Sequence, residues 1–249
     1  MPATPAADLS EIFSSLQGEG DLVGYRQVFL RLTGCNLSCA YCDTDFAATP
    51  VCRVEEVPGS GQLVEYDNPL RIEQVVALLQ RWTQRYPGAH HSVSITGGEP
   101  LLHADLLQHW LPHIRALLPV SLETNGTLPA ALQAVIGMVD RVAMDIKLPS
   151  QTGAATDWSV QRDFLQIARR VACSVKLVVG EDSTAAELLQ AAGLVAAAGA
   201  AIPIILQPVT RQQKVAVSTA RLLEFQALVA ARHPNTRVIP QTHIFMGVM

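Results

Sequence analysis

The feature that most constrains the fold of this chain is an alternation of short apolar runs with longer segments of helical periodicity. Apolar runs predict strands at residues 28–33, 92–96, 120–124, 141–147, 173–179 and 202–207. Helical patterns occupy residues 70–86, 104–118, 129–137, 159–170, 184–198 and 217–233. Residues 175–179 are apolar apart from Lys176, which is typical of a parallel strand buried on both faces. Repeated strand–helix units predict an α/β protein with a parallel sheet or barrel.

Polar and glycine-rich segments stand where the predicted strands end. In α/β sheets and barrels, ligands bind at the carboxyl ends of the strands, because those ends meet at one rim. We therefore expect one site that combines five segments: Gly34-Cys35, Gly97-Gly98-Glu99-Pro100, Glu123-Thr124-Asn125-Gly126, Asp145 with Lys147, and Gln207-Pro208.

Composition narrows the class of protein. The chain has 249 residues, of which 49% are apolar and 16% charged, with a formal net charge of −4. A disordered chain would be richer in charge, and the acidic balance argues against a nucleic-acid partner. The longest apolar stretch, residues 191–206, contains glycines and a proline and is shorter than a membrane span of about 20 residues. No signal-peptide pattern is visible, so we expect a soluble, cytoplasmic protein without a membrane partner.

We expect residues 1–249 to form one domain, because this length suits a single α/β barrel. Residues 46–68 show no clear periodicity and are rich in proline and glycine. We predict a loop or small insertion there.

Cys35, Cys39 and Cys42 form a C-x3-C-x2-C cluster directly after the first predicted strand. Three thiolates on a short loop can hold one metal centre, whereas a structural zinc or an ordinary [4Fe–4S] cluster takes four ligands. Cys52, Cys173 or a histidine are the candidates for a fourth ligand, and without one an iron stays open for catalysis. We interpret Cys173 as a core residue and Cys52 as a non-ligand.

Arg31 is informative because it lies in an apolar strand, on the same face as Phe29 and Thr33. A buried guanidinium is costly unless it is paired. A substrate carboxylate would be a bidentate partner. The alternative is an ion pair with a Glu or Asp on a neighbouring strand.

The cysteine spacing, followed by Gly97-Gly98-Glu99-Pro100 after the next strand, resembles the radical S-adenosylmethionine (SAM) superfamily over residues 11–243. The resemblance implies that the three cysteines hold a [4Fe–4S] cluster whose open iron binds SAM. One electron then cleaves SAM to methionine and a 5′-deoxyadenosyl radical, which abstracts a hydrogen atom from the substrate.

Narrower motifs resemble the 7-carboxy-7-deazaguanine synthase family: residues 11–20 (EIFSSLQGEG), 29–31 (FLR), 42–44 (CDT), 96–100 (TGGEP), 123–126 (ETNG) and 241–243 (QTH). The resemblance implies a lyase of queuosine and deazapurine biosynthesis. It would contract the ring of 6-carboxy-5,6,7,8-tetrahydropterin to 7-carboxy-7-deazaguanine with loss of ammonia. It further implies Mg²⁺, a homodimer, a flavodoxin- or ferredoxin-type electron donor, and a partial TIM-type barrel of about six parallel strands with a reduced set of helices.

The resemblance also implies roles for individual residues. Thr44 would bind Mg²⁺. The substrate would be bound by Leu16, Gln17, Gly18, Glu19, Arg31, Thr96 and His243, with the carboxylate of Met249 as a further candidate. SAM would be bound by Tyr41, Gly98, Glu99, Glu123, Thr124, Asn125, Asp145, Lys147, Gln207, Pro208 and Val209.

The chain departs from the family pattern at Asp145-Ile146-Lys147, where a Ser-Pro-Lys-like tripeptide is more usual, and at Ile244, where Lys is frequent. Two other functions share the cysteine cluster. One is a radical SAM activase that installs a glycyl radical on a partner enzyme, and the other is a zinc-stabilised binding module. Arg31 and the turn at residues 16–20 favour the small-molecule synthase over the activase, whereas metal analysis would decide between the synthase and the zinc module.

Overall fold

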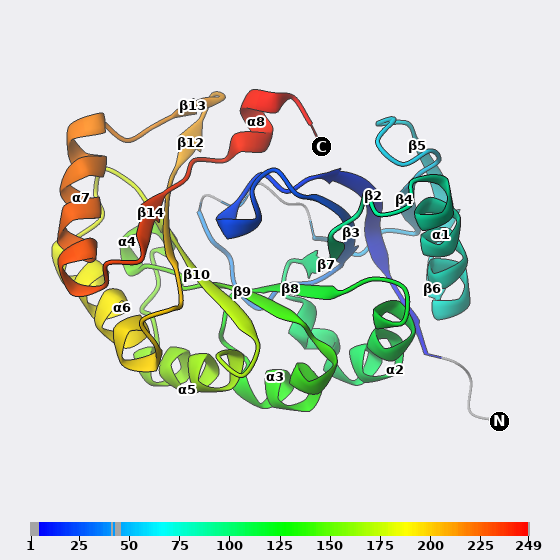
Figure 1. Ribbon diagram of the computed structural model, residues 1–249, viewed down its shortest axis with the longest axis horizontal. Helices are drawn as coiled ribbons and strands as arrows, with labels where there is room; N and C mark the ends of the chain where they lie inside the picture. The colour runs from blue at the N-terminus through cyan, green and yellow to red at the C-terminus, as the bar shows by residue number, and fades with distance from the viewer. Residues whose placement is uncertain (1–4, 41, 43–45, 249) are drawn as a thin grey trace.

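The computed structural model describes residues 5–40, 42 and 46–248, in which ten strands form one curved sheet (Figure 1). From one edge to the other the strands are β14 (Thr236–Val238), β11 (Ile204–Pro208), β10 (Ala172–Val179), β9 (Arg141–Asp145), β8 (Val120–Thr124), β7 (Ser92–Gly97), β3 (Arg26–Leu32), β2 (Leu9–Leu16), β4 (Val51–Glu55) and β5 (Leu63–Asp67). The strands from β14 to β3 are parallel, and β2 runs antiparallel to β3. The two edges do not pair with each other, so the sheet is a partial barrel.

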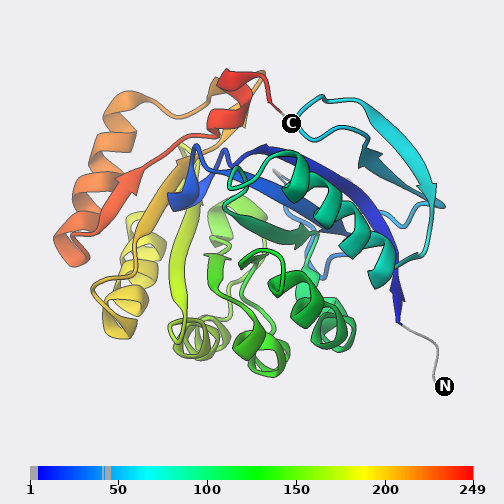
Figure 2. The same ribbon diagram turned by 45° about the vertical axis from the view of Figure 1, so that its right-hand side comes forward.

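Helices cover the convex side of this sheet in an arc, which Figures 1 and 2 show from two directions. The long ones are α1 (Ile72–Arg85), α2 (Ala104–Arg115), α3 (Pro129–Val135), α5 (Trp158–Ala168), α6 (Ala185–Ala198) and α7 (Thr219–Arg232). The shorter elements are α4 (Pro149–Thr152), α8 (Thr242–Met246), the 3-10 turns η1 (Gly20–Leu22), η2 (Pro100–His103) and η3 (Ile136–Met138), and the short strands β1 (Ala6–Ala7), β6 (Leu70–Arg71), β12 (Thr210–Arg211) and β13 (Lys214–Val215). In the described part of the chain, these helices are too short or too polar to cross a membrane.

Local sequence explains where the helices begin. Thr184 caps α6 and forms a capping box with Glu187, whose side chain accepts from the Thr184 backbone N–H. Asp157 caps α5 through the backbone N–H groups of Ser159 and Val160. Each cap satisfies N–H groups that the first turn of a helix leaves without partners.

The two faces of the parallel strands differ in polarity. In β9, Val142 and Met144 are fully buried against the helices, whereas the alternate residues Arg141, Ala143 and Asp145 are half-buried on the concave face. The same alternation places Lys176 of β10 on the concave side, where it lines a cavity. The apolar core therefore lies between sheet and helices, and the concave face is left for polar side chains.

The predicted fold class is confirmed. All six predicted strands and all six predicted helices are present within a few residues of their expected bounds, and β14 adds a seventh, short parallel strand. Residues 46–68, predicted as a loop or small insertion, carry β4 and β5, which extend the sheet beyond β2, so the loop alternative was wrong. Its Pro58-Gly59-Ser60-Gly61 run forms only the turn between them, and Cys52 and Val54 are buried.

The connection between β2 and β3 has an unexpected path. It lies at the amino ends of the parallel strands, closed by the Gln17 N–H to Tyr25 carbonyl bond of 2.8 Å. From there it turns into the concave face, where η1 packs against β10 and β11 (dark blue in Figure 1). An ion pair between Asp21 and Arg141 of β9 fixes this position. Residues 16–22 therefore close the partial barrel from below.

Candidate active site

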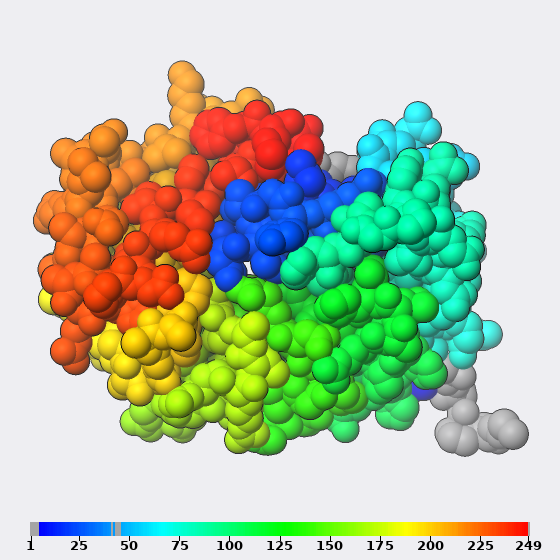
Figure 3. Space-filling view, in the orientation of Figure 1, coloured from blue at the N-terminus to red at the C-terminus, as the bar shows by residue number. Residues whose placement is uncertain are grey.

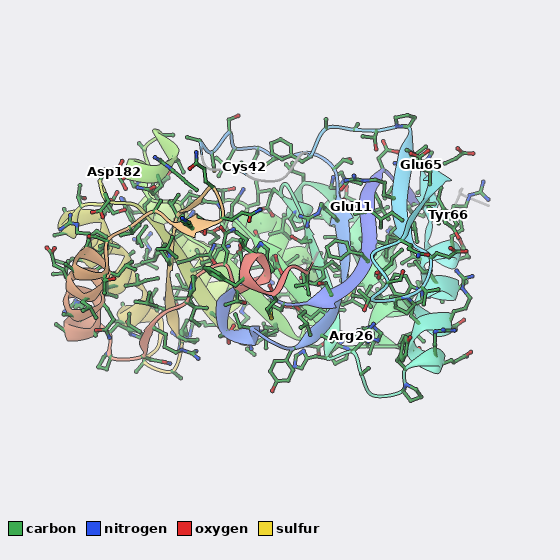
Figure 4. All side chains as sticks on the ribbon, turned by 90° about the horizontal axis from the view of Figure 1, so that it is seen from above. Glu11, Arg26, Cys42, Glu65, Tyr66 and Asp182 are labelled. Atoms are coloured by element: carbon green, nitrogen blue, oxygen red, sulfur yellow. The ribbon has the colours of Figure 1, made fainter. Side chains whose placement is uncertain are left out.

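A cavity of about 550 Å³ fills the concave face of the sheet. Its floor is the turn at residues 16–20, its walls are the parallel strands, and the cysteine loop lies at the rim. Figure 4 shows Cys42 on the side where β3 ends and Arg26 on the side where β3 begins. The expected site residues that line the cavity are Leu16, Gln17, Gly18, Glu19, Arg31, Cys35, Cys39, Cys42, Thr96, Gly98, Glu123, Thr124, Asn125, Asp145, Lys147, Gln207, Pro208, Val209 and His243.

Three of the expected residues, Tyr41, Thr44 and Met249, lie outside the described residues. The roles assigned to them therefore remain expectations. Of the expected residues that the structure does describe, only Glu99 is not part of the cavity lining.

Glu99 is instead buried beside the cavity, with 1% of its surface exposed. Its Oε1 accepts from the Thr124 hydroxyl at 2.9 Å and the Leu101 N–H at 3.0 Å, and its Oε2 accepts from the Asn125 N–H at 2.7 Å. Burial raises the pKa of Glu99, against the effect of these three hydrogen bonds. In this arrangement Glu99 joins the segments after β7 and β8.

The cysteine loop is held by the ends of these two strands. The Glu99 N–H donates to the Gly34 carbonyl at 2.9 Å, and Asn125 Nδ2 donates to Asn36 Oδ1 at 2.9 Å. A Cβ atom at Gly98 would lie 2.2 Å from the Gly34 carbonyl oxygen. Glycine is therefore required at position 98 so that the two loops can touch.

The three clustered thiols are placed so that they can share one iron–sulfur cluster. All three line the same cavity. A [4Fe–4S] cluster binds each cysteine through a different iron, so the thiols need not converge on one point. Cys173 lies in the core as expected, Cys52 is also buried there, and neither lines the cavity. This argues against either as the fourth ligand of a closed zinc site.

Glu123, which is expected to bind SAM, contacts the floor turn and β7. Its Oε1 accepts from Gln17 Nε2 at 2.9 Å and Ser94 Oγ at 2.7 Å, and its Oε2 accepts from Thr96 Oγ1 at 3.2 Å. Gln17 and Thr96 are expected substrate residues. Glu123 therefore contacts two of the residues that are expected to bind the substrate.

Arg31 lies in the cavity wall beside the stacked rings of Phe13 and Phe29, whose centroids are 5.0 Å apart. Its Nε donates to Glu11 Oε2 at 3.2 Å, and the other oxygen of Glu11 accepts from Arg53 of β4. An ion pair with an acid on the neighbouring strand, the alternative set out above, is thus present. It engages Nε, and Arg31 still lines the cavity.

The C-terminal segment covers the floor turn. The Thr242 N–H and hydroxyl both donate to the Gly18 carbonyl, at 2.8 and 3.0 Å. His243 packs so closely on Gly18 that a Cβ atom there would lie 2.4 Å from its Nδ1. Figure 3 shows the C-terminal (red) and N-terminal (blue) segments side by side at the surface.

Four charged side chains of alternating sign form a row along one wall. Lys176 Nζ lies 2.5 Å from Glu19 Oε2 and 3.3 Å from Asp145 Oδ2, and Lys147 Nζ lies 2.7 Å from the same Asp145 oxygen. Burial opposes charge in this row, but the ion pair with Lys176 prevails and lowers the pKa of Glu19 to about 2. The pKa of Lys176 is raised for the reciprocal reason, so both groups stay charged.

Sequence reasoning missed Lys176 and Gln241 as cavity residues. For Lys176 a signal existed, because it is the one charged residue in the apolar run 175–179. Gln241 belongs to a quoted motif, but its contact with Glu19 joins residues 222 positions apart, which no local pattern reveals.

Comparison with known proteins agrees with this geometry. Residues 30–194 match the model of the radical SAM superfamily. The chain is 49% identical to the 7-carboxy-7-deazaguanine synthase of Geobacter sulfurreducens over 98% of both chains. It is 33% identical to the synthase of the same name from Methanothermobacter thermautotrophicus over 97% of this chain and 98% of that protein. The crystal structure of QueE from Escherichia coli has the same fold, with a TM-score of 0.59 over 96% of this chain and 95% of that one at 22% identity.

Proposed function

The chain belongs to the 7-carboxy-7-deazaguanine synthase family of the radical SAM superfamily, and from this premise we propose how its cavity carries out the reaction. The substrate is 6-carboxy-5,6,7,8-tetrahydropterin, and the product is 7-carboxy-7-deazaguanine. The net change is a ring contraction with loss of ammonia, a lyase reaction that consumes no external oxidant. The observation that carries the proposal is one cavity lined by both the cysteine loop and a polar floor.

Arg31 and Glu123 set the orientation of the substrate. The Arg31 guanidinium pairs with the substrate carboxylate, since its Nε is anchored on Glu11 and its fork is suited to a bidentate partner. Glu123 accepts from the N–H groups of the pterin ring. The stacked pair of Phe13 and Phe29 supplies an apolar wall for a flat heterocycle.

The floor turn completes substrate recognition. Gln17 is held by Gln27 and Glu123 through its Nε2, at 2.8 and 2.9 Å, and its Oε1 accepts from the Glu19 N–H at 3.0 Å. These bonds fix the backbone of residues 16–20, so that its amides and carbonyls present a rigid edge to the ring. His243 closes the same turn from above.

Cys35, Cys39 and Cys42 would hold the [4Fe–4S] cluster. The expected SAM residues that line the cavity, of which Gly98 is the first and Val209 the last along the chain, would hold SAM. When bound, this pair supplies a carbon-centred radical that can remove a hydrogen atom from the substrate. The chain's own contribution is placement, because the floor and Arg31 hold the substrate carbon that carries the carboxylate toward the rim.

Three further features are proposed from the family resemblance alone. Mg²⁺ binds at Thr44, the electron comes from a flavodoxin- or ferredoxin-type protein, and the active form is a cytoplasmic homodimer. Activity measured with and without Mg²⁺, and the mass of the native protein in solution, test the first and the last of these.

The proposed function is tested by anaerobic turnover. Reconstituted, reduced protein with SAM, Mg²⁺ and 6-carboxytetrahydropterin should release 7-carboxy-7-deazaguanine and ammonia in equal amounts. The Cys35→Ala variant should release neither. Protein that contains about four irons per chain and binds SAM, yet forms no product, would contradict the proposal.

A further inference from the structure

We propose that Lys176 is the positioning residue of the substrate turn, holding Glu19 of the floor against Asp145 of the SAM-facing wall. The inference rests on the proposed function, which assigns the floor turn to the substrate. It concerns a lysine that the sequence motifs do not include.

The charge of Lys176 is largely buried and therefore has to be stabilised by neighbouring side chains. It projects from the middle of β10 into the cavity, between Ser174 and Val178, with 23% of its side chain exposed. As the one charged residue of β10, Lys176 loses hydration on burial and needs polar partners to compensate. Glu19 and Asp145 are those partners, at 2.5 and 3.3 Å.

Lys176 and Gln241 together account for both oxygens of Glu19. Lys176 Nζ contacts Oε2, and Gln241 Nε2 donates to Oε1 at 2.9 Å. The contact with Lys176 ties the floor turn to a rigid strand of the sheet, whereas Gln241 belongs to the C-terminal segment. Removal of Lys176 would therefore free the carboxylate from the sheet and leave it on the more distant segment only.

Asp145 helps to fix the position of the Lys176 ammonium. Its Oδ2 is shared by Lys176 and Lys147, so the ammonium of Lys176 is drawn to two carboxylates from different elements and is fixed between them. The row Glu19, Lys176, Asp145 and Lys147 also has zero net charge.

Position and charge balance can be separated by mutation. Lys176→Met removes the bridge and leaves one net negative charge in the row, whereas Lys176→Met/Asp145→Asn removes the bridge and keeps the row neutral. Lys176→Arg keeps the charge. Lys214→Met is the matched control, because it makes the same change at an exposed lysine outside the cavity.

The readout is the Kd of 6-carboxytetrahydropterin, measured anaerobically by calorimetry on cluster-loaded, unreduced protein so that no turnover occurs, together with the thermal unfolding midpoint. We expect Lys176→Met to raise Kd by about tenfold or more and to lower the midpoint. The neutral double variant should recover the midpoint but keep the raised Kd. Lys176→Arg should regain most of the affinity, and Lys214→Met should match the wild type in both measurements.

Two results would overturn the inference in distinguishable ways. If the double variant binds the pterin within about twofold of the wild type, Lys176 serves charge balance only and the positioning role is wrong, while the proposed function stands. If the wild type binds SAM but neither binds nor converts the pterin, the proposed function fails and the inference fails with it.

Discussion

Substitution of Gly98 by alanine tests whether the conformation of the cysteine loop depends on its contact with the loop after β7. A Cβ atom at this position would lie 2.2 Å from the Gly34 carbonyl oxygen and 2.6 Å from Cys35 Cβ. Real Cβ atoms essentially never come closer than 3.0 Å to other heavy atoms, so the backbone at Gly34 has to withdraw by roughly 0.8 Å. Neither contact is with a flexible side-chain end that could move aside.

The cost follows from two terms. Overpacking against a fixed backbone costs about 1–3 kcal/mol. Withdrawal of Gly34 also breaks the bond from the Glu99 N–H to its carbonyl, worth about 1 kcal/mol. We therefore expect Gly98→Ala to lower the free energy of unfolding by about 2–4 kcal/mol. Because Cys35 follows Gly34 directly, the variant should also hold less iron.

Urea denaturation of cluster-free protein measures the first effect, and iron per chain after reconstitution measures the second. Gly137→Ala is the control, because a Cβ atom there meets nothing within 4 Å, and it should change stability by less than about 0.5 kcal/mol. A Gly98→Ala protein with wild-type stability and a full complement of iron would refute the reasoning, because it would mean that the two loops are not in contact.

Three further predictions concern charge, thiols and a helix. The pKa of Glu19 is lowered from 4.5 to about 2 in the fold, so its contribution of about 3 kcal/mol is complete above pH 4.5 and is lost as pH falls from 4.5 to 2. Glu19→Gln should flatten the pH dependence of unfolding in this window, and an unchanged slope would contradict the assignment. Burial raises the pKa of Cys52 and of Cys173 to about 12. Iodoacetamide at pH 8 should therefore modify the loop thiols of cluster-free protein but not these two, as measured by mass spectrometry. Equal labelling rates would show that the core opens. Gly193→Ala within α6 should stabilise the protein by about 0.5–1 kcal/mol in urea denaturation, since its Cβ atom would make only ordinary contact with Arg232 at 3.7 Å, and a destabilised variant would argue against this packing.

The sequence was sufficient for the parallel strands because their burial makes them apolar and their ends carry the motifs. It was insufficient for β2, whose Ser10, Ser14 and Ser15 are buried although they are polar. They are tolerated because hydrogen bonds satisfy them, as between Ser14 Oγ and His90 Nε2 at 2.9 Å. Such partners are distant in sequence, so no local pattern predicts the strand.

The site shows the same limit. Glu99 and Glu123 were both predicted to bind SAM, because each belongs to a motif at the end of a strand. In the structure Glu123 lines the cavity, whereas Glu99 is buried beside it. Glu99 follows the end of β7 and turns inward to hold the next loop, whereas Glu123 lies one residue before the end of β8 and faces the floor. Periodicity assigns a side chain to a face, but which neighbours occupy that face depends on the path of residues 16–22, which only the folded chain reveals.

The contact between the floor turn and residues 241–243 has a consequence for synthesis of the protein. The floor turn is made early in synthesis, but residues 241–243, which cover it, are made more than 200 residues later. Contacts of such long sequence separation form slowly and late in folding. The cysteine loop can therefore form before residues 241–243 cover the floor turn, so that iron can be delivered while this turn is still open and the pterin is recognised only by a finished chain.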